Sequence, residues 1–229
     1  MKLEALNERQ KEAVITTEGP VLVIAGAGSG KTKVLTTRIA YLIKNKNIST
    51  DNILAITFTN KAAKEMKDRV SNILNQNVRR MHISTFHSFG VEILKNYGYL
   101  INVDKNFTIL DSDDSLKVIK IIVDDMNLSK TLSPKHIKDV ISSYKNKLIL
   151  PEEAEKNTFT FEEKQIVDIY NKYQRKLANS NSVDFDDLLL MPYLILDKNI
   201  NVLEALQEEY KYILIDEYQD TNDAQYFLV

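Results

Sequence analysis

The 229-residue sequence lacks cysteine entirely and has only six glycines. Without cysteine the chain can form no disulfide framework, no thiolate zinc site and no thiol nucleophile. Long apolar runs are also missing: the stretch 188–191 is typical of the longest, whereas a membrane-spanning helix needs roughly 18 apolar residues. The charged start MKLEALNERQ lacks the apolar stretch of a signal peptide. We therefore expect a soluble cytoplasmic protein with no membrane partner.

The rest of the composition is that of an ordinary globular protein, with 44% hydrophobic and 27% charged residues. Its length allows one large domain or two small ones. The net charge of −2 hides an asymmetry, because residues 31–105 carry 13 basic and 5 acidic side chains whereas residues 183–229 carry 2 and 11. The basic segment could face a polyanion and the acidic one could suit magnesium, or both could be spread over solvated helix faces.

Short β-prone runs alternate with helical patterns along the chain. The runs are 21–25, 53–58, 81–85 and 212–216, and apolar residues recur at helical spacing within 34–43 and 62–74. This alternation predicts βαβ units and a parallel sheet flanked by helices, an α/β fold. From about 107 to 181 the pattern is helical, with Asp111 or Ser112 as the first N-cap. The apolar run 226–229 ends without a capping residue, which favours a chain cut from a longer protein.

A glycine-rich segment follows the first β-prone run. It consists of Ala25, Gly26, Ala27, Gly28, Ser29, Gly30, Lys31 and Thr32. Its glycines allow backbone N–H groups to face a phosphate, Lys31 can reach the β- and γ-phosphates, and Thr32 can ligate Mg²⁺. The strict P-loop pattern has glycine where Ala25 stands, a small departure because alanine fits that position if its φ is negative. An incidental glycine-rich turn is the alternative. The order of strand, loop, Lys-Thr and helix favours ATP with Mg²⁺ as cofactors.

A second chemical element is the segment YILIDEYQDTN at 212–222. An apolar strand that ends in Asp216 and Glu217 places one carboxylate to hold Mg²⁺, directly or through water. The next carboxylate can orient and deprotonate an attacking water. Strands that end in acidic turn residues are common, so this interpretation depends on the P-loop upstream.

Seven ordered segments resemble the opening motifs of the UvrD/Rep/PcrA-type superfamily 1A DNA helicases. They are LNERQKEAV (6–14), AGAGSGKT (25–32), ITFTNKAAKEM (56–66), STFHSF (84–89), FTILDSDD (107–114), VDFDDLL (183–189) and IDEYQDTNDAQY (215–226). The resemblance implies a P-loop NTPase with a RecA-like ATP-binding domain formed by 1–106 and 183–229, truncated at its C-terminal end. An all-helical subdomain, 107–182, would be inserted into it.

The resemblance also implies roles around the nucleotide. Gln10 would read the adenine edge, and Arg38 would lie near the nucleotide. Gln219 would couple the nucleotide state to the DNA side, while Asp220 would support the magnesium coordination. By themselves Gln10 and Arg38 could equally be surface residues of helices.

Residues that could bind nucleic acid lie at the strand end TFTN. Thr57, Thr59 and Asn60 offer polar groups, Phe58 offers a ring, and basic residues follow between 61 and 69. Together they resemble a stacking and phosphate-tracking surface for a single strand. The family would place Phe58 and Phe185 against bases, and Thr59, Asn60, Thr85 and His87 near the phosphodiester backbone. A core position for Phe58 and a structural role for His87 are the alternatives.

The implied function is the N-terminal part of an ATP-dependent 3′–5′ single-stranded-DNA translocase. It would unwind 3′-tailed duplex DNA in repair or replication, associated with the nucleoid and aided by accessory proteins. Family members continue into a second RecA-like domain that supplies transition-state arginines, so residues 1–229 alone should be nearly inactive.

One alternative is the helicase part of an AddA- or RecB-like recombination nuclease, which the short insertion disfavours. Another is a P-loop kinase or metabolic ATPase, which leaves five motifs unexplained. A pure binding module would describe residues 1–229 only.

Overall fold

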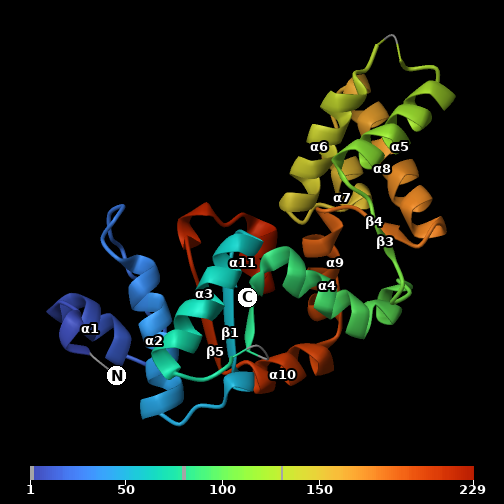
Figure 1. Cartoon of the computed structure of the whole chain (residues 1–229). Coiled ribbons are helices and arrows are strands. Elements are labelled where there is room, and N and C mark those ends of the chain that lie inside the picture. Colours follow the sequence, from blue (N-terminus) through green and yellow to red (C-terminus); the bar gives the residue numbers. More distant parts are fainter. Residues whose placement is uncertain (1–2, 79–80, 130) are drawn as a thin grey trace. The chain divides into compact units, whose positions relative to one another are not determined.

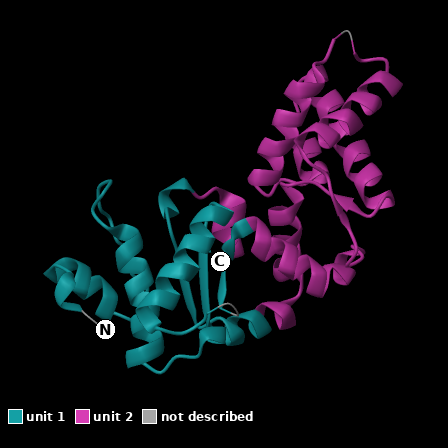
Figure 2. Cartoon of the chain, viewed as in Figure 1, with its two compact units in different colours: residues 1–86, 204–220 teal, residues 87–203, 221–229 magenta. Residues whose placement is uncertain are grey.

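The computed structural model describes residues 3–78, 81–129 and 131–229. The chain forms two compact units (Figure 2): unit 1 consists of residues 1–86 and 204–220, and unit 2 of residues 87–203 and 221–229. The predicted division into 1–106 with 183–229 and an inserted 107–182 follows different boundaries and stays a prediction.

Unit 1 is built around a three-stranded parallel sheet in the order β2–β1–β5 (Figure 1). Its elements are η1 (Leu3–Ala5), α1 (Glu8–Ile15), α2 (Lys31–Asn45), η2 (Thr50–Asn52), β1 (Ile53–Thr57), α3 (Asn60–Leu74), β2 (His82–Thr85), β5 (Tyr212–Ile215) and η4 (Tyr218–Asp220), with part of α10 (Ile200–Glu209). In the centre of the sheet, Leu54 of β1 lies opposite His82 on one side and Ile213 on the other. All five residues of β1 are buried, as the uninterrupted apolar run ILAI predicts for a central parallel strand.

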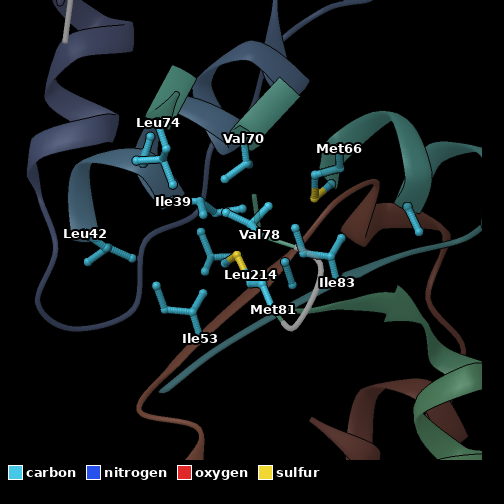
Figure 3. Close-up of a cluster of buried hydrophobic side chains, with 13 residues drawn as sticks. Ile39, Leu42, Ile53, Met66, Val70, Leu74, Val78, Met81, Ile83 and Leu214 are labelled. Carbon is cyan, nitrogen blue, oxygen red and sulfur yellow. The ribbon is translucent and has the colours of Figure 1, made fainter. Parts of the chain in front are cut away.

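The hydrophobic core of unit 1 lies between this sheet and helices α2 and α3. Helix α3 contributes Ala63, Met66, Val70 and Leu74, whose spacing of three and four residues puts them on one helical face. Figure 3 shows Met66, Val70 and Leu74 in one cluster with Ile39 and Leu42 of α2 and Ile53 of β1. The predicted helical patterns at 34–43 and 62–74 are therefore confirmed.

Three of the four predicted strands are present, and the fourth is wrong. Residues 21–25 form no strand, and Figure 1 draws them within the loop that precedes α2. Their apolar side chains are largely exposed, with Ile24 at 88%. The run VLVIA has strong β propensity, but a strand exists only where another backbone pairs with it. The local sequence does not show whether another strand lies beside residues 21–25 to pair with them.

Unit 2 is mainly helical, with a short two-stranded parallel sheet. Its elements are α4 (Phe86–Tyr97), η3 (Gly98–Ile101), β3 (Thr108–Ile109), α5 (Ser112–Asp125), α6 (Pro134–Asn146), α7 (Pro151–Lys156), α8 (Phe161–Asn179), β4 (Ser182–Val183), α9 (Asp187–Lys198) and α11 (Asp223–Leu228). The side chain of Asp111 caps α5 by accepting hydrogen bonds from the N–H groups of Asp113 and Asp114, which confirms that predicted helix start.

The pair β3 and β4 was not predicted, because two residues are too short for a recognisable strand pattern. Thr108 lies opposite Ser182, and Ile109 opposite Val183, so the helical segment between them leaves and returns at one place. Helices α5, α6 and α8 pack around a core that includes Ile119, Ile137 and Ile169. Among the helices that the structure describes, none is long and apolar enough to cross a membrane. The protein is thus an α/β protein with parallel strands and many helices, as the sequence predicts.

Candidate nucleotide and nucleic-acid sites

The glycine-rich loop leads directly into α2 in unit 1. Gly28 and Gly30 have φ angles of +74° and +89°, in the left-handed region that glycine adopts without a steric penalty. Gly30 is the N-cap of α2, and no side chain among the described residues caps this helix. The first N–H groups of α2 are therefore directed toward the loop without a side-chain acceptor, an arrangement that favours an anion.

Lys31 folds back over this loop. Its Nζ donates hydrogen bonds to the carbonyl oxygens of Ala25 at 3.1 Å and Gly26 at 3.3 Å. The N–H of Ser29 also donates to the Gly26 carbonyl, at 3.3 Å. Neutral carbonyls are weaker partners for an ammonium group than a phosphate oxygen is. Lys31 can therefore exchange these bonds for a phosphate without leaving the loop. Thr32, half-buried, follows in the first turn of α2.

Gln10 connects α1 to the same loop. Its Oε1 accepts the N–H of Asn7 at 3.1 Å, its own N–H donates to the Asn7 side chain, and its Nε2 donates to the Ser29 carbonyl at 2.9 Å. A methyl group at Gly30 would lie 3.3 Å from that Nε2. The structure thus places Gln10 beside the loop with both ends of its amide bonded to protein, so a contact with adenine requires these bonds to open.

Arg38 joins α2 to the end of α1. Its Nη1 donates to the carbonyl of Ala13 at 2.7 Å and to that of Thr16, two of the terminal carbonyls that a helix leaves unpaired. Burial lowers the pKa of Arg38, and the nearby Glu18 partly offsets this. The observed contacts are those of a structural cross-link, and a contact of Arg38 with nucleotide stays a prediction.

Asp216 follows β5 in the acidic turn. Its N–H donates to the Ile56 carbonyl at 2.9 Å, and its Oδ1 accepts the N–H of Glu217 at 3.2 Å. Burial raises the pKa of Asp216, the neighbouring Glu217 raises it further, and Lys31 and Arg69 act in the opposite direction. A buried carboxylate that is costly to ionise is one that a bound cation would stabilise.

The other acidic-turn residues are linked through one amide. Gln219 donates from Nε2 to Glu217 at 2.6 Å and to Asp220 at 3.3 Å. Glu217 has a φ of +51°, a conformation that only a few per cent of non-glycine residues adopt and that is enriched at functional sites.

A magnesium site in unit 1 would rest on few protein ligands. Within the described residues, no group of three or more histidine or acidic side chains is arranged to hold a metal ion. Thr32 and Asp216 offer a hydroxyl and a carboxylate, the hard oxygen ligands that Mg²⁺ prefers together with water and phosphate oxygens. The donor set therefore fits a Mg²⁺ ion that arrives with a nucleotide.

The predicted DNA-contacting residues of unit 1 lie at the carboxyl ends of β1 and β2. Thr57 and Thr85 lie opposite each other in the sheet, and both are buried. Thr59 caps α3 by accepting the N–H of Ala62 at 3.1 Å, and Asn60 is exposed.

The ring of Phe58 is half-buried and meets the ring of Phe86 edge-to-face, with 5.6 Å between centroids. Sequence reasoning missed Phe86, although it stands inside the quoted motif STFHSF. Only the fold shows that this ring faces Phe58.

The two remaining predicted residues, His87 and Phe185, belong to unit 2. Their rings also meet edge-to-face, at 5.8 Å and 65°, although they are far apart in sequence. Phe185 is 51% exposed. Burial lowers the pKa of His87, with Asp186 raising it in part, so His87 is neutral at pH 7 and can offer a phosphate a hydrogen bond but no charge.

Comparison with known proteins adds a family. The family model of the UvrD/REP helicase N-terminal domain matches residues 6–229. The chain is 50% identical over 228 residues to the ATP-dependent DNA helicase PcrA of Bacillus subtilis (strain 168), which covers 99% of this chain and 31% of that protein. It is 47% identical to PcrA of Staphylococcus epidermidis (strain RP62A) over 98% of this chain, and 46% identical to PcrA of Staphylococcus aureus (strain Mu50) over 99%. The chain spans about a third of the length of these relatives.

Proposed function

This chain belongs to the family of UvrD/REP helicase N-terminal domains, and from that premise we propose that it is the ATP-binding part of a DNA motor. The full-length protein would be an ATP-dependent helicase that moves 3′ to 5′ along single-stranded DNA and unwinds 3′-tailed duplexes in repair or replication. One observation carries the proposal: the P-loop with Lys31 and the acidic turn with Asp216 lie in the same unit, close enough for Lys31 to lower the pKa of Asp216.

The proposed fold follows from the same premise. Residues 1–106 and 183–229 form a RecA-like domain, and residues 107–182 form a helical insertion. The pairing of Thr108 with Ser182 supports this division, because it joins the two ends of the inserted segment.

In the proposed nucleotide site, the residues 25–32 surround the phosphates and Lys31 exchanges its two loop carbonyls for the β- and γ-phosphates. Bound Mg²⁺ would neutralise phosphate charge, held by Thr32 and Asp216. Glu217 orients the attacking water and accepts its proton. The Gln219 amide, which bonds both Glu217 and Asp220, is placed to respond when either carboxylate changes its partner.

In the proposed DNA site, Phe58 and Phe185 stack against bases, and the polar residues Thr57, Thr59, Asn60, Thr85 and His87 approach the phosphodiester backbone. Gln10 and Arg38 complete the nucleotide side, at the adenine edge and near the nucleotide respectively. The named relatives are DNA helicases, so we favour this function over a recombination nuclease, a kinase or a metabolic ATPase.

The test is ATP hydrolysis by the full-length protein with and without single-stranded DNA at one stated salt concentration. Lys31→Ala should abolish the DNA-stimulated rate. The matched control is Lys46→Ala, an exposed lysine at the far end of α2, which should leave the rate unchanged. Hydrolysis that does not respond to DNA would contradict the motor function and would direct attention to a small-molecule phosphate acceptor.

A further inference from the structure

A lysine is completely buried in the helical unit. Lys145, near the end of α6, has no exposed side-chain surface and pairs with Asp184 at 2.7 Å and Asp187 at 2.8 Å. Its Nζ also lies 5.1 Å from the centre of the Tyr173 ring. Lysine is almost never fully buried, and apolar residues of similar volume are often at least as stabilising as a buried ion cluster. The stability of unit 2 alone therefore does not explain why a charge is placed here.

Lys145, Asp184 and Asp187, here called the ion cluster, fix the turn 184–187 from both sides. Asp184 Oδ1 accepts the N–H of Asp187 at 2.9 Å, and Asp187 Oδ2 accepts the N–H of Asp184 at 3.1 Å. The remaining oxygens accept Lys145 together with the Tyr173 hydroxyl at 2.9 Å or the Gln174 amide at 3.3 Å. All four carboxylate oxygens thus have partners, and among the atoms around them only the Oε1 of Gln174 is buried without a hydrogen-bond partner within the described residues.

The electrostatics keep this cluster ionised. Burial by itself lowers the pKa of Lys145, but Asp187 and Asp184 outweigh it and the net pKa is raised. Burial opposes ionisation of Asp184 too, but Lys145 holds its pKa below the ordinary value. Burial raises the pKa of Asp187 to about 6. At neutral pH, above this value, Asp187 is mainly ionised as well, so the Lys145 ammonium group faces two carboxylates.

Phe185 lies inside this fixed turn and points away from it. The flanking Asp184 and Asp187 are buried, whereas Phe185 is half exposed and its ring meets that of His87. A close approach of two helices supports the pair: a methyl group at Gly90, one turn after His87 in α4, would lie 1.8 Å from the carbonyl oxygen of Leu188 in α9. Gly90 therefore allows α4 to contact the start of α9, where the turn ends.

We propose that Lys145 is a positioning residue for Phe185: it holds Asp184 and Asp187 so that Phe185 and His87 form a preformed aromatic platform for a base of single-stranded DNA. The inference rests on the proposed function, since it deepens the DNA contact assigned there to Phe185. A preformed platform loses less conformational entropy when it binds DNA. Substitutions that loosen the platform should therefore lower the affinity for single-stranded DNA.

The experiment measures binding of a labelled oligothymidylate to the full-length protein at fixed salt. Lys145→Met alone would leave two buried carboxylates unpaired. The test variant is therefore Lys145→Met with Asp184→Asn and Asp187→Asn. These substitutions keep the side-chain size, and each asparagine keeps a side-chain oxygen that can accept the backbone N–H of the other. Lys172→Met is the matched control, because Lys172 is an exposed lysine of the same unit, paired with Asp168. Stacking of one base on an aromatic ring predicts a loss of affinity of about 10-fold in the triple variant and none in the control.

The decisive comparison repeats the triple substitution in a Phe185→Ala background. If Lys145 acts through Phe185, the triple substitution should weaken DNA binding less than about twofold in the Phe185→Ala background. The reason is that the effects of coupled residues on the binding free energy do not add. In the presence of Phe185, the DNA concentration for half-maximal ATP hydrolysis should rise about 10-fold, as affinity does, with the rate at saturating DNA unchanged.

Residues 1–229 contain no tryptophan, so Phe185→Trp adds one indole to this part of the full-length protein. The fluorescence anisotropy of the added indole, measured as the difference from the protein without it, should fall when the triple substitution frees the turn.

Two results would overturn the inference while leaving the proposed function intact. In the first, the triple substitution lowers DNA affinity equally with and without Phe185. In the second, the triple substitution leaves DNA affinity unchanged while Phe185→Ala lowers it. If Phe185→Ala itself leaves DNA affinity unchanged, the proposed DNA contact fails and the inference fails with it.

Discussion

Asp216 combines burial with a neighbouring carboxylate, and both raise its pKa above the ordinary 3.8. Between pH 3.8 and the raised value, the folded protein retains a proton that the unfolded chain has lost. Stability therefore decreases as the pH rises through this window, and the ionised carboxylate destabilises the fold at every higher pH. The proposed role of Asp216 in holding Mg²⁺ would account for this cost, because active sites commonly retain groups at the expense of stability.

We expect Asp216→Asn to raise the thermal unfolding midpoint at pH 7.5, because asparagine removes the buried charge and retains an acceptor for the Glu217 N–H. The gain should shrink as the pH falls to 4, toward the ordinary 3.8, because the raised pKa leaves Asp216 protonated in the folded protein there. The same substitution should abolish ATP hydrolysis. Scanning calorimetry at the two pH values measures the first effect.

Asp68→Asn provides the reference for that experiment, since Asp68 is exposed on α3 in the same unit. It should leave the midpoint unchanged at both pH values. A lower midpoint for Asp216→Asn than for the native protein at pH 7.5 would show that Asp216 is stabilised by contacts other than those described.

At the scale of elements, Arg38 holds α1 against α2 through two backbone carbonyls. We expect Arg38→Ala to lower the free energy of unfolding by about 2 kcal/mol, as the loss of hydrogen bonds to a charged group does. Arg38→Lys should recover only part of this loss, because an ammonium group lacks the planar, forked donors of a guanidinium. Urea unfolding measures both changes.

Arg69→Ala is the control for this junction, because Arg69 pairs with Glu65 at 3.6 Å on an exposed face of α3. Such a surface pair contributes at most about 0.5 kcal/mol. If Arg38→Ala were no more destabilising than Arg69→Ala, the contacts of Arg38 would be free for a nucleotide role.

What the sequence could predict depended on whether the cause was local. The capping of α5 by Asp111 and the amphipathic face of α3 arise from neighbouring residues, and both were predicted correctly. The run 21–25 failed because pairing is decided by a distant backbone. Lys145 lies 39 residues from Asp184, and a lysine within a helical pattern predicts a solvent-exposed side chain. Only the fold reveals that it is the centre of an ion cluster.

For the proposed nucleotide site, the sequence predicts which side chains lie at the loop 25–32 but not their present hydrogen-bond partners. Lys31 and Gln10 stand where the motifs predict, next to the loop 25–32. Their hydrogen bonds to Ala25, Gly26 and Ser29 could not be anticipated, since a motif encodes the ligand-bound contacts and gives no information about competing ones.

At the scale of the whole molecule, residues 1–229 should be a poor ATPase. The family resemblance implies that transition-state arginines come from a second RecA-like domain, and such arginines contribute roughly 10³ to 10⁵ in rate. We expect a difference of that order between residues 1–229 and the full-length protein, both measured as phosphate release with single-stranded DNA. Comparable rates would mean that residues 1–229 already contain a complete catalytic site.

The exposed run Val21, Leu22, Val23 and Ile24 also affects how the protein behaves at high concentration. Four consecutive β-prone apolar residues without a charge form a short template for cross-β association. Within the described residues β5 pairs only with β1 and leaves one edge of the sheet open. Purified residues 1–229 should therefore precipitate or form fibrils as the concentration rises. A lysine introduced by Val23→Lys would act as a gatekeeper and extend the usable solubility range.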